Sequence, residues 1–173
     1  IESCPGGQVI ADGEYEKSGY TFYMNVIKVR GESGKESLTI NGGTFTSTKG
    51  DAVEVDSGKV VFNGGTYQGC RHTIHGHQFG SMEILFNGGT FLKQTGSGED
   101  FSTVWIFPPH DFTFNGGTYY GDILIAYNAE YPDRLYLKAY LGDGVKAYIN
   151  GVLASDEALR SGKVSGAPIE FKK

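Results

Sequence analysis

The chain has 173 residues, of which 39% are hydrophobic and 27 are glycine, and its formal net charge is −5. This length fits one domain with one core, and this hydrophobic content excludes wholesale disorder. Glycine disfavours long helices and the negative charge disfavours a surface that holds a nucleic-acid backbone, so we expect a turn-rich β protein without a nucleic-acid partner.

The first residue, the two cysteines and the apolar runs of the chain indicate little about its chemistry. The chain begins at Ile1 rather than Met, so we expect a processed or shortened chain from which any secretion signal has been removed. Cys4 and Cys70 form neither a disulfide framework nor a metal motif; we expect free or buried thiols, with one disulfide as the alternative. The chain has no run of 18 apolar residues, so we expect no transmembrane segment.

Four segments repeat one pattern, in which alternating apolar residues precede Asn-Gly-Gly-Thr and an aromatic residue follows. The copies are residues 38–45, 60–67, 84–91 and 112–119, and degenerate copies at 9–15 and 135–138 flank them. The repeated asparagines are separated by 22, 24 and 28 residues. Self-similarity at this period is the signature of a solenoid.

Each copy predicts a short strand, a sharp bend and another short strand. Glycine adopts backbone angles that other residues avoid, and asparagine tolerates the left-handed region better than most. Isolated hairpins with strands this short are unstable, so we expect the copies to stack, each strand pairing in parallel with its counterpart in the next coil. The period predicts a coil of three short strands, and the copies together predict about six coils.

These Asn-Gly-Gly-Thr-Phe/Tyr repeats resemble those of bacterial secreted and surface proteins that fold as right-handed parallel β-helices of the pectate-lyase-like group. The resemblance covers about residues 9–140 and implies an all-β, single-stranded right-handed parallel β-helix that is extracellular or on a bacterial cell surface. Members of this group include polysaccharide lyases, glycoside hydrolases, adhesins and phage fibres, so the resemblance leaves the activity open.

Stacking of the copies predicts which side chains form the core. The expected inward columns are Leu38, Val60, Ile84 and Phe112; Ile40, Phe62, Phe86 and Phe114; and Phe45, Tyr67, Phe91 and Tyr119. The column of Asn41, Asn63, Asn87 and Asn115 is interpreted as a structural ladder of side-chain hydrogen bonds rather than a ligand site.

The last part of the chain predicts a cap on the solenoid, whose end strand would otherwise present unpaired backbone groups. We expect residues 1–140 to form the coils and residues 141–173 to form a cap in the same domain. The cap would contain a hairpin over 145–153 with an Asn150-Gly151 turn, a helical turn capped by Ser155 and ending at Gly162, and a strand over 168–171.

A further strand in each coil carries the polar residues that could perform a function. These strands are expected at residues 25–30, 52–56, 73–77, 103–107 and 122–127. With Val53, Val55, Ile74, Val104 and Ile106 inward, alternation places Lys28, Glu54, His75 and Trp105 in one outward column and Arg30, Asp56, His77 and Phe107 in the next. Each acid would then lie beside a histidine, whereas a register slip of one residue would invert every assignment.

Three functions remain open for this outward strip. The preferred hypothesis is a polysaccharide-binding or adhesive module that uses Glu54, His75, His77, Trp105, Phe107 and His110. The second is a glycoside hydrolase using Glu54 and Asp56 with help from His75 and His77, or a polysaccharide lyase whose base is Lys28, Arg30 or Arg71. The third is a structural spacer in a larger surface protein, with solvated charge pairs on this face.

No cofactor and no metal are expected from the sequence. His72, His75, His77, His110 and Cys70 are the candidates for zinc, but alternation along a strand would separate His72 from His75 and His77. No acidic motif recurs from coil to coil, so calcium is not indicated either.

Overall fold

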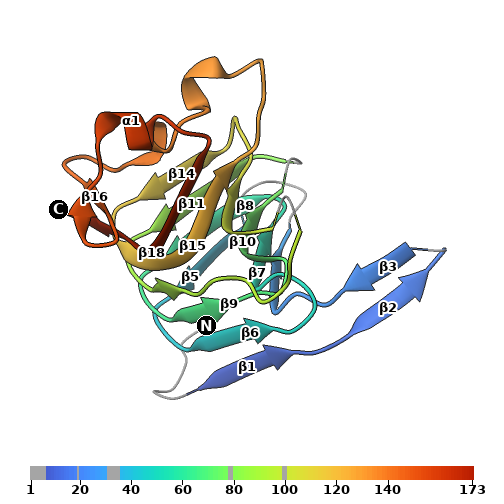
Figure 1. Ribbon diagram of the computed structural model, residues 1–173. Coiled ribbons are helices and arrows are strands. Elements are labelled where there is room, and N and C mark those ends of the chain that lie inside the picture. Colours follow the sequence, from blue (N-terminus) through green and yellow to red (C-terminus); the bar gives the residue numbers. More distant parts are fainter. Residues whose placement is uncertain (1–6, 19, 31–35, 78–79, 99–100) are drawn as a thin grey trace.

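The repeats form a parallel β-solenoid of about four turns, which the computed structural model describes for residues 7–18, 20–30, 36–77, 80–98 and 101–173 (Figure 1). In each complete turn one strand ends at the Asn-Gly-Gly bend, a second follows the bend, and a third follows the next corner. This arrangement confirms the expected coil of short parallel strands.

Strands of the same kind stack over one another into the faces of the solenoid. Sheet 1 contains β5 (Ser37–Ile40), β8 (Gly58–Phe62), β11 (Met82–Phe86) and β14 (Asp111–Phe114). Sheet 2 contains β1 (Gln8–Ala11), β6 (Thr44–Ser47), β9 (Thr66–Gln68), β12 (Thr90–Phe91) and the start of β15 (Gly117–Ile125). Sheet 3 contains β4 (Ile27–Val29), β7 (Val53–Val55), β10 (His72–Gly76), β13 (Ser102–Ile106) and the end of β15.

The register confirms the predicted columns, because equivalent residues of successive turns are direct partners. Phe62 pairs with Phe86 and Phe86 with Phe114, and their rings stack at centroid distances of 5.2 and 4.7 Å. Tyr67 and Phe91 stack in the same way at 5.0 Å in the neighbouring column. The two columns meet edge to face and all five rings are fully buried, so these aromatic stacks dominate the core.

The Asn-Gly-Gly bend combines a hydrogen-bonded ladder with two sterically constrained glycines. Asn87 Nδ2 donates to Asn63 Oδ1 over 2.9 Å, and the same bond recurs between the other asparagines of the column. Gly89 has a φ of 112°, a conformation that side chains with a Cβ rarely adopt. A Cβ on Gly88 would lie 2.7 Å from the Asn63 carbonyl oxygen, so the first glycine is required by close stacking of the coils.

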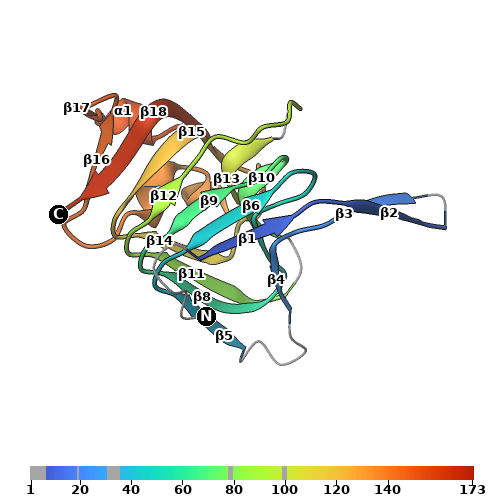
Figure 2. The ribbon, with the colours of Figure 1, turned by 90° about the horizontal axis from the view of Figure 1, so that it is seen from below.

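Both degenerate copies were misread, and the expected six coils are reduced to about four turns. At the N-terminal end, Val9 pairs with Phe45 in sheet 2, and residues further on form an antiparallel hairpin of β2 (Glu14–Lys17) and β3 (Tyr20–Tyr23) that extends away from the solenoid (Figures 1 and 2). The Thr44 amide donates to the Gly7 carbonyl oxygen over 3.0 Å, just as the Thr66 amide donates to Gly43, so Gly7 rather than Gly13 takes the place of the second glycine of the bend.

The second degenerate copy forms helical turns instead of a strand. The turns are the 3-10 helices η1 (Pro132–Arg134) and η2 (Leu137–Tyr140), which are followed by one isolated bridge from Leu141 to Phe114. The copy lacks the Asn-Gly-Gly bend, and Pro132 suits the start of a helical turn. Leu137 and Tyr140 are nevertheless buried, so apolar alternation identified core residues but not their backbone conformation.

The C-terminal residues form the predicted hairpin and cap elements. β16 (Lys146–Ile149) and β17 (Val152–Leu153) pair across the Asn150-Gly151 turn, and Ser155 accepts a hydrogen bond from the Ala158 amide at the start of α1 (Asp156–Leu159). The helix ends earlier than Gly162. β18 (Lys163–Lys172) is longer than expected because it runs antiparallel along the whole of β15 and occupies the edge of the last turn (Figure 2).

Two further sequence expectations concern the cysteines and membrane-spanning segments. Cys70 is a free cysteine, whereas Cys4 lies outside the described residues. Helices of the length and apolarity needed to cross a bilayer do not occur in the described part of the chain.

Replacing an asparagine inside the ladder is expected to destabilise the protein more than replacing one at its end. Asn87→Ala removes one donated and one accepted bond, whereas Asn41→Ala removes only the bond accepted from Asn63. We expect losses of unfolding free energy of about 1–2 and about 0.5–1 kcal/mol respectively, measured by urea denaturation. Equal losses for the two variants would contradict a continuous ladder.

Candidate functional site

The candidate site lies on sheet 3, where the pairing register agrees with the one predicted. Lys28 pairs with Glu54, Glu54 with His75 and His75 with Trp105, which places these residues in one column. The inward residues Val53, Val55, Ile74, Val104 and Ile106 are fully buried. The apolar core therefore fixes which side chains of these strands face outward.

The second outward column continues just beyond the ends of the strands. The Asp56 amide donates to the Val29 carbonyl oxygen over 2.8 Å, and the His77 amide donates to the Val55 carbonyl oxygen over 2.9 Å. These bonds extend the parallel ladder past the assigned strands, so Asp56 and His77 occupy successive turns of the same column.

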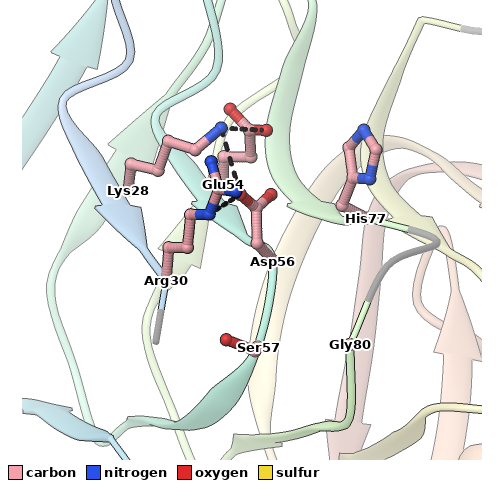
Figure 3. A pocket seen from close by; sticks show the side chains of 7 residues that line it. All are labelled: Lys28, Arg30, Glu54, Asp56, Ser57, His77 and Gly80. Atoms are coloured by element: carbon pink, nitrogen blue, oxygen red, sulfur yellow. Dashed lines mark hydrogen bonds and ion pairs between the residues drawn. The ribbon is translucent and has the colours of Figure 1, made fainter. Parts of the chain in front are cut away.

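Part of this outward face is a hollow, which we call the charged hollow, of about 440 Å³ and open to solvent (Figure 3). Lys28 Nζ lies 2.8 Å from Glu54 Oε1 and 3.2 Å from Asp56 Oδ2, so one ammonium bridges both carboxylates. The residues that line the hollow are Lys28, Arg30, Glu54, Asp56, Ser57, His77 and Gly80.

Neighbouring groups hold the two carboxylates of the hollow in place. Arg30 Nε is 3.9 Å from Asp56 Oδ2, and Asn25 Nδ2 donates a hydrogen bond to Glu54 Oε2. Burial opposes the charge of Lys28, but its bonds to Glu54 and its proximity to Asp56 outweigh burial and raise its pKa above the ordinary value. The amine therefore stays protonated at neutral pH.

His77 lies on the opposite side of the hollow from Lys28 (Figure 3). Burial lowers its pKa, the nearby His75 lowers it further, and Asp56 and Glu54 only partly compensate. At neutral pH the imidazole is therefore uncharged and offers one donor and one acceptor. The register brings His77 beside Asp56 as expected, although this carboxylate does not keep the ring protonated.

A second group of polar residues, the Asp51 cluster, consists of Asp51, His72 and His75 and is almost completely buried. His75 Nδ1 lies 2.9 Å from Asp51 Oδ2, and Asp51 Oδ1 accepts the His72 backbone N–H over 3.0 Å. Burial raises the pKa of the Asp51 carboxyl, but the hydrogen bond and electrostatic attraction from His75, together with smaller contributions from His72 and Arg71, outweigh burial and lower this pKa. His75 is thus bonded to Asp51, although Glu54 is its partner in the register.

His72 completes the Asp51 cluster because β10 begins at the corner between sheets 2 and 3. Its ring centroid lies 4.7 Å from that of His75, so strand alternation did not separate the two histidines. Burial lowers the pKa of His72 to about 3, which leaves the imidazole neutral at physiological pH. Its Nδ1 lies 3.1 Å from Ser102 Oγ and 3.3 Å from the Ser102 amide nitrogen.

Asp51 is the site residue that sequence reasoning missed. It precedes Ala52 and Val53 at the corner, outside the alternating strand that guided the prediction. Its position directly between Gly50 and a buried apolar run was the available signal, because an acidic residue there is expected to need a buried partner. Asn25 accepts the Asp51 amide from one turn below, over 2.7 Å.

The remaining predicted residues do not join the charged hollow in the described structure. The Trp105 ring lies parallel to the His75 ring at 5.2 Å, so one of its faces is covered. His110 is buried in a loop, where its amide nitrogen is 3.3 Å from the Phe107 carbonyl oxygen. The Arg71 guanidinium lies 5.9 Å above the Tyr23 ring. Of the predicted binding residues, only Glu54 and His77 line the hollow, together with the catalytic candidate Asp56.

No protein-family model, curated protein sequence or solved structure matches this chain.

Removing the Asp51 carboxylate is expected to destabilise the fold. Asp51→Ala leaves the His72 amide and the His75 ring without their buried acceptor, and we expect a loss of about 3 kcal/mol of unfolding free energy. Asp111→Ala is the control, because Asp111 pairs with Arg134 at the surface and contributes less than about 1 kcal/mol. Similar losses in urea denaturation would contradict the role of Asp51.

Proposed function

We propose that the chain is a glycan-binding module whose binding surface is the charged hollow. The observation that carries this proposal is the fixed pair of Glu54 and Asp56 carboxylates, bridged by Lys28 inside an open hollow. Carboxylates accept hydrogen bonds from sugar hydroxyls, and ammonium and guanidinium groups donate to them. Because these groups are already ordered by one another, binding would lose little side-chain entropy.

The charge of the hollow supports a hydroxyl-rich ligand. Its acids, Glu54 and Asp56, are balanced by Lys28 and Arg30, and His77 is neutral at physiological pH. A strongly anionic ligand would have to compete with the carboxylates for the cations. A neutral or weakly charged polysaccharide would instead find donors and acceptors side by side.

We further propose that the solenoid is a right-handed β-helix of the pectate-lyase-like group, located outside the cell or on a bacterial surface. The Asn-Gly-Gly-Thr repeats and the parallel stacking of their strands support this assignment. A secreted or surface-attached module of this kind would meet polysaccharides directly, either as an adhesive domain or as a carbohydrate-binding unit.

Cleavage of the glycan is the second candidate function, favoured by the bond between Asp51 and His75. A carboxylate that orients an imidazole is a frequent arrangement for a general base. The carboxylates of the hollow favour binding instead, because hydrolysis needs one acid and one base in different environments, whereas Lys28 contacts both. A lyase would need a neutral amine, and the raised pKa of Lys28 opposes that role.

Binding and its dependence on the hollow can be measured on a glycan array followed by calorimetry with the best ligand. Asp56→Asn is expected to weaken the affinity about tenfold or more, because it removes a charged acceptor. Glu83→Gln is the matched control, since Glu83 forms an analogous ion pair with Lys59 on sheet 1 at 2.9 Å. Equal effects of the two variants would rule out the hollow as the binding surface.

The same assays distinguish the alternatives. Oligosaccharide products or unsaturated sugar ends would establish cleavage in place of simple binding. If no tested glycan gives binding or products, the glycan-binding proposal fails and the structural-spacer hypothesis is favoured.

Trp105→Ala tests whether the binding surface extends from the hollow along the outward column. Trp105 is half-buried and keeps His75 in place by stacking, and its exposed part can contact a sugar ring. We expect a several-fold loss of glycan affinity, with partial retention in Trp105→Phe. Unchanged affinity in Trp105→Ala would restrict the surface to the charged hollow.

A further inference from the structure

The Asp51 cluster presents a set of metal-binding atoms that the glycan-binding proposal does not use. Asp51, His72 and His75 each offer one ligand atom, and these atoms lie within 4.8 Å of one another. Asp51 and His72 are 1% and 0% exposed, and His75 is 9% exposed. The three donors come from adjacent turns at the same corner, where the backbone ladder fixes their positions.

One atom of the cluster has an unmet hydrogen-bonding requirement. His72 Nε2 is buried and has no hydrogen-bond partner among the described residues. A buried polar atom without a partner costs about 1–3 kcal/mol, so such atoms are rare unless something occupies the position next to them. Nδ1 of the same ring faces Ser102, which leaves Nε2 as the atom available to a ligand.

We propose that Asp51, His72 and His75 bind a divalent transition metal ion of the zinc class. Two imidazole nitrogens and one carboxylate oxygen form a donor set that suits such ions, whereas calcium and magnesium prefer oxygen ligands. Asp51 Oδ2 and His75 Nδ1 are already 2.9 Å apart, and the ion would replace the proton that they share.

The surroundings of the cluster resemble those that support metal-binding histidines. A metal-bound imidazole usually donates its other N–H to a nearby acceptor. With the ion on Nε2, the ring proton would move to His72 Nδ1, which would then donate to Ser102 Oγ, 3.1 Å away, in place of accepting the Ser102 amide. Trp105 packs against both imidazole rings, at 4.7 Å from His72 and 5.2 Å from His75, and Phe101 lies 5.9 Å from His72. These rings exclude water, which strengthens the attraction between the ion and Asp51.

Two features define the route by which the ion would enter and the coordination position that the protein would leave unfilled. The His75 side chain is 11% exposed on the outward side of sheet 3, so entry is from that side. Three protein ligands leave a fourth position for water or another small ligand, as in open zinc sites. The site is distinct from the charged hollow, because none of the three proposed ligands lines it.

The test is a titration of the chelator-treated full chain with Co²⁺, followed by displacement with Zn²⁺. We expect one equivalent of Co²⁺, visible absorption bands of a site with nitrogen ligands, loss of these bands on adding Zn²⁺, and a higher melting temperature with Zn²⁺. His75→Gln and Asp51→Asn are expected to weaken binding at least about tenfold. His77→Gln is the matched control and is expected to retain wild-type affinity.

Folding of each variant is checked by circular dichroism and urea denaturation before metal is added. His72→Gln affects the most buried member of the cluster. Because His75 is slightly exposed, at 9%, His75→Gln is the decisive variant if His72→Gln does not fold. Failure to bind stoichiometric Co²⁺ or Zn²⁺ would overturn the proposal. Equal weakening by His77→Gln and His75→Gln would overturn it as well, and neither result bears on glycan binding.

Discussion

The in-register stacking of equivalent residues from one turn to the next is the constraint on which the whole structure depends. It places Phe62, Phe86 and Phe114 face to face at 4.7–5.2 Å and buries them completely. It also brings each Asn of the bend within hydrogen-bond distance of the next one, 2.8–3.0 Å away. A shift of one residue would break both arrangements at once, so core packing and bend geometry select the same register.

The corner between sheets 2 and 3 carries a second ladder with a different chemistry. Asn25 Oδ1 accepts the Asp51 amide, Asp51 Oδ1 accepts the His72 amide, and the His72 ring faces the Ser102 amide in the same way. The fold requires only a side-chain acceptor at each step, and Asn, Asp and His all satisfy this requirement. This corner can therefore hold titratable groups without loss of structure, whereas the Asn-Gly-Gly corner cannot.

The sequence predicted those parts of the fold in which each turn repeats the previous one. Identical motifs implied the columns of Phe62 and Tyr67 and the outward position of Glu54 and His75, all of which depend on local alternation and stacking. The two degenerate copies were not predictable in this way, because β1 and η2 are determined by the edges they cover, whereas local turn and capping residues predicted the β16–β17 hairpin and the Ser155 cap. Asp51 was not identified from the sequence for a related reason: its partner His75 comes from the next turn, across a corner.

The two candidate sites differ in the freedom of their side chains, even though His75 of the cluster is the direct partner of Glu54 of the hollow in sheet 3. His75 is bonded to Asp51 and stacked on Trp105, so its ring is held against the corner rather than over the hollow. The chemistry of the hollow therefore rests on Glu54, Asp56 and Lys28, which stabilise one another at the surface. A metal ion in the cluster would tie His75 more firmly to the corner and leave these three groups unchanged. Distance from the corner between sheets 2 and 3 thus separates a rigid buried site at the corner from an open charged one at the far ends of the strands.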